Sequence, residues 1–516
     1  MRSDHSYEIK SRKSWLALKT MIRGMITLLV ILLLSTSIFA QRPTVSQYGS
    51  LAFTHTTVID MTGAPPKSDM TVIIVGARIK AIGKSAKVKI PEDARIVNAN
   101  GKYLIPGLWD MHAHTRKDKV TREIVFPLEI ANGVTGTRVM AADCIGEGGC
   151  RDREPFEVHL LWKKAIAAGS LVGPRLVLAS TYVDGPHPLN LGSMIVNNAA
   201  QARDAVRTAK RQGVDFIKIH NNLSRESYFA LADESKKLGI SFAGHVPWLI
   251  GAIEAANAGQ KSEEHLFGVL EACSGREAEL LSARERLTRT PRDYSKDLRA
   301  LVQKQRDSLS YDGDCKKLFQ ALVKHGTWVV PTFNYWRAAA DFSYLEAPRI
   351  QDDGRLRYLP LSMRERWESL LGRALPSITQ KDVTESRRLF RERLAFLKRL
   401  LDAGVGILPG TDCDVVYTIP GFNVHDELAM FVEGGLTPME ALQTATRDSA
   451  KYLNVSSSLG TVAKGKLADL VLLEANPLED IHNTAKIGAV VVNGRYFPSE
   501  SLQKMLSDVE EAAKKN

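Results

Sequence analysis

Short apolar segments alternate with amphipathic helical patterns through the middle of this chain, and no other feature restricts its fold as strongly. In the helical patterns, such as residues 224–239 and 383–403, apolar side chains recur every three or four positions. Strands and helices that alternate in this way form parallel sheets, and eight repeats close a barrel. We therefore predict an α/β fold, a (β/α)₈ TIM-like barrel, with strands at residues 103–114, 136–140, 175–180, 215–220, 241–246, 262–267, 327–332 and 405–412.

Both ends of the chain indicate β structure outside this barrel. Short runs rich in Val, Ile and Thr, separated by Gly and Pro, occupy residues 48–105 and return at 460–498. We expect these two segments to form one small composite β-sandwich domain, and residues 106–459 to form the barrel. The long charged intervals at about 273–315 and 335–395 are expected to be helical insertions that cover the active-site face as lids.

The first 40 residues are expected to be a signal peptide. Lys19 and Arg23 precede an apolar run at residues 25–39, which is shorter than the roughly 20 residues of a membrane span and is followed by Ala40. The basic leader is long, and Met21 would be a more usual first residue. We expect an exported, periplasmic or extracellular protein with no stable membrane span after cleavage; an uncleaved N-terminal membrane anchor is the alternative.

The charge of the chain argues against a nucleic-acid partner. The formal net charge is +11, but residues 1–24 contribute +4 of it through six basic and two acidic residues, which leaves about +7. That excess is spread over the whole length, and no basic stripe with interleaved aromatic residues is present. A small-molecule substrate is the expected partner.

Five cysteines in an exported protein indicate disulfides. Cys144 and Cys150 bracket a glycine-rich loop, and Cys273 and Cys315 bracket a charged insertion. Pairing within each bracket would leave Cys413 unpaired, although spacing alone leaves other pairings open.

Residues able to bind metal recur where the predicted strands end. His112 and His114 alternate at the end of the first strand, so both side chains point the same way and can share one ion, with Asp110 one step back on that face. Active-site groups of such barrels lie at the carboxyl ends of the strands. The other polar residues at those ends are Lys218, His220, His245, His265 and Asp412.

Lys218 stands out because it ends an apolar strand. A buried, unpaired ammonium is costly, whereas a neutral amine can react with CO₂ to form a carbamate, N6-carboxylysine, whose two oxygens can bridge two cations. The alternative is a lysine paired with a nearby carboxylate.

Together these motifs resemble the amidohydrolase superfamily, in its imidazolonepropionase-like and metal-dependent prolidase-like branch. The resemblance covers roughly residues 50–500 and includes Pro-Gly-Leu-Trp-Asp before the histidine pair and Gly-Thr-Asp at 410–412. It also includes three tail motifs: His425-Asp-Glu-Leu, Gly435-Leu-Thr-Pro-Met-Glu-Ala-Leu and Gly465-Lys-Leu-Ala-Asp-Leu-Val-Leu-Leu.

The resemblance implies a binuclear centre of two divalent ions, with Zn²⁺ expected and Mn²⁺ or Co²⁺ open. One ion would be held by His112, His114, carboxylated Lys218 and Asp412, and the second by Lys218, His245 and His265. It also implies that a hydroxide bridges the metals, that Asp412 is the catalytic proton carrier, that His187 steadies the oxyanion, and that the protein is a homo-oligomer.

Two further residues are candidates for substrate contacts. Tyr228 lies on the first turns after the fourth strand, and Arg337 follows the seventh strand beside Trp336. The alternatives are helix packing for Tyr228, lid packing for Arg337, and an ordinary loop histidine for His187. His220 shares the face of Lys218 and is expected beside the ligands.

The sequence thus predicts an exported, metal-dependent amidohydrolase that cuts an amide or peptide bond in a dipeptide or N-acyl amino acid. A lactone, cyclic-amide or organophosphate hydrolase with the same metals is the rival enzyme. A catalytically inactive barrel used for binding is the alternative from another class. It would lack at least one metal-binding residue, yet all six expected metal-binding positions are filled.

Overall fold

The structure, a computed structural model, describes residues 49–146, 150–188, 190–288, 295–311, 313–341, 353–374, 378–413 and 415–516. The predicted signal peptide lies outside these residues. Within the described part of the chain, no helix combines the length and the apolar character needed to cross a membrane.

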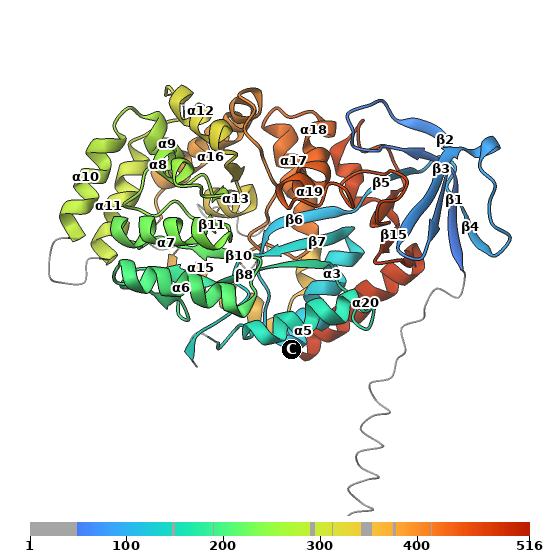
Figure 1. Cartoon of the computed structure of the whole chain (residues 1–516), viewed down its shortest axis with the longest axis horizontal. Helices are drawn as coiled ribbons and strands as arrows, with labels where there is room; N and C mark the ends of the chain where they lie inside the picture. Colours follow the sequence, from blue (N-terminus) through green and yellow to red (C-terminus); the bar gives the residue numbers. More distant parts are fainter. Residues whose placement is uncertain are drawn as a thin grey trace, which may run out of the picture. The chain divides into compact units, whose positions relative to one another are not determined.

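A parallel barrel forms the larger part of the structure, as predicted (Figure 1). Residues 405–413 fill the eighth position: Ile407 bridges to Val329 on one side, and Cys413 bridges to Ala113 on the other. In chain order the other barrel strands are β6 (Leu108–Ala113), β7 (Val134–Val139), β8 (Arg175–Asp184), β10 (Phe216–Ile219), β11 (Phe242–Gly244), β12 (Ser262–Glu264) and β13 (Trp328–Val330); β9 (Met194–Ile195) pairs with β8. The residues of β7 and β12 are all buried, including polar and charged ones, because barrel strands are covered on both faces.

Helices follow the strands and cover the barrel. Their ends carry standard caps: in α7 (Arg225–Leu238), Ser224 accepts the N–H of Ser227 at the start and Gly239 is left-handed at the end. The other short connections contain α2 (Asp118–Val120), the π-helix η2 (Thr121–Val125), α3 (Phe126–Ala131), α5 (Phe156–Ala167), α6 (Ala199–Gln212) and α8 (Ala252–Asn257). The C-terminal connections contain α17 (Phe422–Glu433), α18 (Pro438–Gln443), the π-helix η5 (Thr444–Asp448), α19 (Ser449–Tyr452), η6 (Ile481–Ala485) and α20 (Ser499–Lys515).

The two longest connections are helical. Between β12 and β13 lie α9 (Val269–Cys273), α10 (Glu277–Thr288), α11 (Ser295–Asp307) and α12 (Lys316–His325). Between β13 and the eighth strand position lie α13 (Phe333–Asp341), η3 (Gly354–Tyr358), α15 (Leu361–Ala374) and α16 (Gln380–Asp402).

The two chain ends share a second sheet, which Figure 1 shows as blue and red strands side by side. Its strands form one hydrogen-bonded sheet in the order β16-β15-β14-β5-β1-β2-β3, with β4 on β1. Side chains from both halves of the sheet, such as Phe53, Val72 and Leu470, share one core. The strands are β1 (Ser50–Val58), β2 (Lys67–Val75), β3 (Arg78–Lys84, followed by η1, Ser85–Lys87), β4 (Ala94–Asn98), β5 (Tyr103–Pro106), β14 (Leu470–Leu473), β15 (Ile487–Val492) and β16 (Arg495–Pro498).

The segment predicted as one strand at residues 103–114 divides at Gly107. Residues before it belong to β5 of the β domain, and residues after it belong to β6 of the barrel. A Cβ at position 107 would lie 2.1 Å from Oγ1 of Thr135, so the close passage between the two sheets requires glycine.

Two disulfides are present in the structure. Cys144 bonds to Cys150, and Cys273 bonds to Cys315. Cys413 is a buried free thiol.

Candidate active site

A cavity of about 320 Å³ opens at the carboxyl ends of the barrel strands. It receives all six predicted metal ligands, together with His220. Its lining is His112, His114, Arg153, Tyr182, Asn190, Lys218, His220, Asn221, His245, His265, Phe267, Arg299, Tyr335, Asp412 and Val415.

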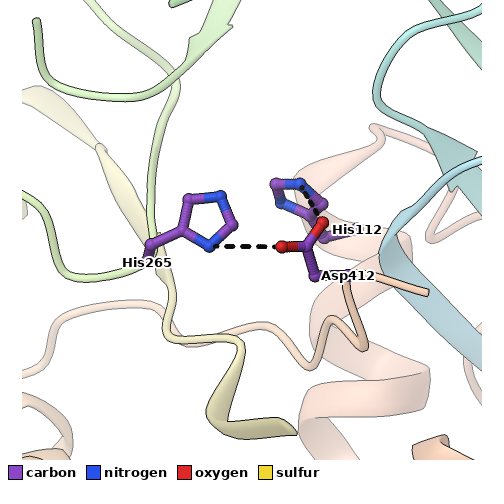
Figure 2. A group of neighbouring side chains, drawn as sticks. All are labelled: His112, His265 and Asp412. Carbon is purple, nitrogen blue, oxygen red and sulfur yellow. Dashed lines mark ion pairs between the residues drawn. The ribbon is translucent and has the colours of Figure 1, made fainter. Parts of the chain in front are cut away.

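Asp412 lies at the centre of a histidine cluster (Figure 2). Its Oδ1 is 3.4 Å from Nε2 of His112 and 3.2 Å from Nε2 of His114. Its Oδ2 is 3.9 Å from Nδ1 of His265. Nitrogen and oxygen donors from three separate segments of the chain therefore meet in one small volume.

These spacings fit a bound metal ion. Ligands about 2.0–2.2 Å from a tetrahedral zinc ion lie roughly 3.4 Å from one another. His112, His265 and Asp412 offer donor atoms within 4.8 Å of each other, and all three side chains are buried. Imidazole and carboxylate together are a donor set that suits zinc.

Each of three imidazoles is oriented by a partner on its second nitrogen. Nδ1 of His112 is 2.7 Å from Oε2 of Glu264, Nδ1 of His245 is 2.8 Å from Oδ1 of Asn221, and Nδ1 of His265 is 2.7 Å from the hydroxyl of Thr332. Such partners set the ring orientation and the tautomer of metal-ligating histidines, so Nε2 is left to bind an ion.

Glu264 is itself held by a buried cation. The Arg138 guanidinium donates to both carboxylate oxygens at 2.9 and 3.0 Å, and Ser262 donates to Oε1 at 2.5 Å. Although burial alone would raise the pKa of Glu264, Arg138 and His112 hold it well below its usual range. Glu264 therefore stays ionised behind His112.

Lys218 is fully buried, and its Nζ has no hydrogen-bond partner among the described residues. Burial lowers its pKa to about 8, against the opposing pull of Glu264 and Asp412. A buried amine that loses its proton this readily is suited to react with CO₂.

Burial also keeps the imidazoles neutral. It lowers the pKa of His114 to about 4 and those of His245 and His265 well below the ordinary value. For Asp412, burial acts in the raising direction, but His112, His114 and His265 hold its pKa far below the usual range. Neutral imidazole and ionised carboxylate are the forms that bind metals.

Strained backbone conformations occur in the same place, as they do at several other positions of the described chain. His265, Thr332 and Asp412 all have positive φ, at 64°, 50° and 53°. Such conformations cost about 1–3 kcal/mol each for residues other than glycine and occur mostly at functional sites. The fold thus tolerates strain where it positions these side chains.

Three predicted site residues do not line the cavity. Tyr228 is fully buried, and its hydroxyl donates to Oε1 of Gln260 at 3.0 Å. Arg337 pairs with Asp426 at 3.0 Å. His187 is exposed on its loop with φ of 58°. The side chains of Tyr228 and Arg337 are therefore engaged outside the cavity lining, and their substrate contacts stay predictions.

The cavity also has walls that the sequence reasoning missed. Arg153 stacks over the ring of Tyr182 at 4.7 Å and donates to its hydroxyl at 3.0 Å. Arg299, from α11 of the first insertion, is a second cation in the lining. His220, which was expected beside the ligands, lines the same cavity, with Nδ1 3.0 Å from Oδ2 of Asp184.

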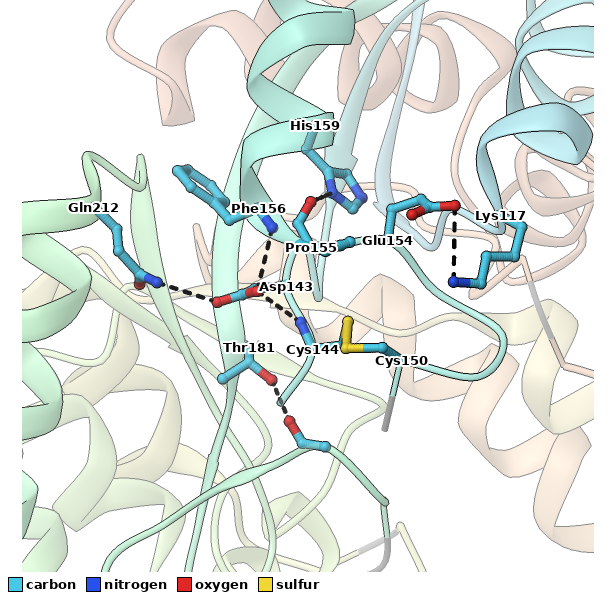
Figure 3. The surroundings of a disulfide bond; sticks show 11 residues. Lys117, Asp143, Cys144, Cys150, Glu154, Pro155, Phe156, His159, Thr181 and Gln212 are labelled. Atoms are coloured by element: carbon cyan, nitrogen blue, oxygen red, sulfur yellow. Dashed lines mark hydrogen bonds and ion pairs between the residues drawn. A yellow bond between two sulfur atoms is a disulfide. The ribbon is translucent and has the colours of Figure 1, made fainter. Parts of the chain in front are cut away.

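The loop that precedes Arg153 is fixed at its base by the Cys144–Cys150 disulfide and by Asp143 (Figure 3). Asp143 Oδ1 accepts the N–H groups of Cys144 at 2.8 Å and Phe156 at 3.2 Å. The chain on both sides of Arg153 is therefore anchored. The cysteine bracket was the sequence signal for this loop, but the entry of Arg153 into the cavity lining depends on folding.

Comparison with known proteins agrees with this geometry. The model of the amidohydrolase family matches residues 103–496, so the chain belongs to this family. Ochratoxinase from Aspergillus niger is 32% identical over 145 residues, which are 24% of this chain and 29% of that protein. The chain thus matches less than a third of the length of this curated relative.

Two solved structures share the fold over most of the chain. An Xaa-Pro dipeptidase with bound methionine aligns over 87% of this chain and 100% of its own, with a TM-score of 0.58 and 20% identity. The bottromycin amidohydrolase aligns over 91% of both chains, with a TM-score of 0.65 and 20% identity.

Proposed function

We propose that this chain is an exported, binuclear metal-dependent hydrolase that cuts the amide bond of a dipeptide or an N-acyl amino acid. One observation carries the proposal. Five imidazoles, four of them from predicted metal ligands, converge on one cavity with the carboxylate of Asp412 and the amine of Lys218, which has no hydrogen-bond partner among the described residues. Two proteins of similar fold, the Xaa-Pro dipeptidase and the bottromycin amidohydrolase, favour amide bonds over other bonds.

The ligands divide between two ions. His112, His114 and Asp412 would hold one, His245 and His265 would hold the other, and a carboxylated Lys218 would join them. Addition of CO₂ to the neutral Lys218 amine forms the carbamate N–C bond and releases one proton. Bound divalent cations would lower the pKa of a coordinated water from 15.7 to about 7 and polarise the scissile carbonyl.

Asp412 is the proposed proton carrier. Its low pKa leaves it unprotonated and able to take the proton of the attacking water. As the C–N bond breaks, the proton passes to the leaving nitrogen, so the products are a neutral amine and a carboxylic acid before they ionise. His187 would need a loop displacement to steady the oxyanion, because it is exposed in the structure.

The walls of the cavity favour a substrate with a free carboxylate. Arg153 and Arg299 line the cavity, and Asp412 is the one carboxylate among the described lining residues. Guanidinium groups bind carboxylates through paired hydrogen bonds. A volume of about 320 Å³ accommodates a small molecule rather than a folded polypeptide.

Export rests on the N-terminal sequence and on the cysteines. Two disulfides in one chain are typical of oxidising compartments outside the cytosol. Assembly into a homo-oligomer is proposed from the family resemblance alone, and light scattering on the purified chain tests it.

The test measures amine release by the purified full chain after incubation with Zn²⁺ and bicarbonate. The substrates are pooled dipeptides and N-acyl amino acids, each matched with its C-terminal amide, which lacks the carboxylate. Release from the free acids that falls sharply with the amides is expected. Absence of release with two ions bound would overturn the amide proposal and favour lactones, cyclic amides or phosphoesters. Absence of bound metal would favour the inactive barrel.

A further inference from the structure

A second cavity, of about 730 Å³, lies at the opposite end of the barrel. Its lining includes residues at the start of strands: Trp109 is the second residue of β6, Arg175 and Phe216 are the first residues of β8 and β10, and Ser241 and Lys261 directly precede β11 and β12. The proposed catalytic residues lie where the same strands end. The second cavity is therefore separate from the candidate active site.

Basic residues dominate the charged part of this lining. Arg138, Arg175, Lys210 and Lys261 face the cavity, against Asp215 as the one carboxylate among its described lining residues. Arg175 is paired with Asp469, and Asp215 is paired with Lys163 at 2.7 Å. These pairings leave the two lysines as the cations that decide the charge of the cavity.

Arg138 is also committed elsewhere. Its guanidinium donates to the carbonyl of Met111, to Ser262 at 2.9 Å, to the hydroxyl of Tyr452 at 2.7 Å and to Glu264. The N–H groups of Arg138 therefore already have acceptors within the protein and are not available to a ligand in the cavity. Lys261 is thus the cation available for a ligand.

Lys261 is more than half buried but has no ion-pair partner among the described residues. Its Nζ lies 4.5 Å from the centre of the Tyr452 ring, and this cation–π contact stabilises the ammonium. Burial, and then the positive charge of Arg138, lower the pKa of Lys261. An ammonium placed in this way gains from an anion that enters the cavity.

The remaining walls are apolar and aromatic. The side chains of Trp109, Phe216 and Leu459 are nearly buried and line the cavity together with the ring of Tyr452. Exposed Lys210 and Asn454 stand at its rim, so the cavity is reachable from solvent. Flat apolar groups suit these walls, and one negative group suits Lys261.

We infer that this cavity is a second ligand site, which binds a small organic anion with an aromatic or apolar body held by Lys261 and stacked beside Tyr452. The site is independent of the hydrolytic reaction proposed above, because it shares no lining residue with the active-site cavity.

The test is a fluorescence titration of the purified full chain with 1-anilinonaphthalene-8-sulfonate, which combines two aromatic groups with one sulfonate. N-phenyl-1-naphthylamine has the same rings without the charge and is the matched neutral probe. We expect the sulfonate to bind saturably at one site per chain and at least about tenfold more tightly than the neutral probe, since a charge-assisted contact is at stake.

Variants assign the binding to this cavity. Lys261→Met is expected to raise the Kd of the sulfonate about tenfold and leave the neutral probe unchanged, and Lys261→Arg, which keeps the cation, is expected to retain binding. Arg153→Met removes a cation from the active-site cavity instead and is the matched control. Sulfonate binding that persists in folded Lys261→Met, or that is lost in Arg153→Met, would overturn the inference.

Discussion

Replacing Glu264 with glutamine tests whether the proposed metal centre depends on the buried carboxylate behind His112. The Glu264 side chain has no solvent exposure and contacts three groups: the Arg138 guanidinium, the Ser262 hydroxyl and Nδ1 of His112 at 2.7 Å. Glutamine keeps the shape but removes the charge. Arg138 would then remain buried, with no ionised partner among its described contacts.

The expected losses are large and of two kinds. Removing one partner of a buried ion pair costs about 3–5 kcal/mol of unfolding free energy, because the other charge stays in a low-dielectric environment. Losing the carboxylate that orients a metal-ligating histidine lowers metal affinity about 10- to 100-fold. Both losses follow from the single change Glu264→Gln.

The neighbouring residue offers a matched control. Glu263 is equally buried, but neither of its carboxyl oxygens has a hydrogen-bond partner among the described residues. Burial raises its pKa well above the usual range and so favours the neutral form, which glutamine matches in charge and shape. Glu263→Gln is expected to change unfolding free energy by less than about 1 kcal/mol.

The assay combines urea unfolding of the metal-free proteins with zinc titration against a competing chelator. Both variants are compared with the unaltered chain at pH 7. Similar losses of stability and metal affinity in Glu263→Gln and Glu264→Gln would refute the reasoning, because burial alone would then explain the effect.

Further predictions concern residues in the cavity itself. Asp412→Asn is expected to leave the melting temperature of the metal-free protein nearly unchanged and to lower kcat by about 10²–10⁴, and turnover near that of the unaltered chain would contradict its role. Lys218→Met is expected to lose one of the two proposed ions, measured by elemental analysis, and bicarbonate should no longer affect activity. Arg153→Met is expected to raise KM for substrates with a free carboxylate about tenfold, with little change in kcat and no change for the amidated analogues. Removal of metal with a chelator is expected to abolish activity and to lower the melting temperature, and Zn²⁺ with bicarbonate should restore both.

The fold followed closely from local patterns in the sequence. Alternating strand and helix periods predicted the parallel barrel, and β-rich segments at both ends predicted the second sheet, which joins β1 to β14 through β5. The prediction of one long strand at 103–114 was wrong. Both halves have the same apolar pattern, so the sequence gives no local sign of the division. Its division depends on the passage of Gly107 against Thr135, which is a long-range contact.

Predictions at strand ends fared differently from predictions on helices and loops. His112, His114 and Lys218 could be placed in one cavity because period-two alternation and barrel geometry determine where strand residues point. Tyr228 is on a helix, where either face can turn toward the barrel, and packing turned it to Gln260. Arg153 follows a disulfide-bonded loop, whose path is set by contacts that no local pattern contains.

The residues that support the ligands were missed for a different reason. Arg138 and Glu264 lie within predicted strands, and a charged residue inside a strand that is expected to be buried was the available signal. Their meaning appears only after the barrel closes, because Arg138 reaches Glu264 from 126 positions away in the chain. A fully buried ion pair seldom stabilises a fold more than apolar side chains of similar size would. Its place behind His112 therefore favours a role in orienting this proposed metal ligand over a role in stability alone.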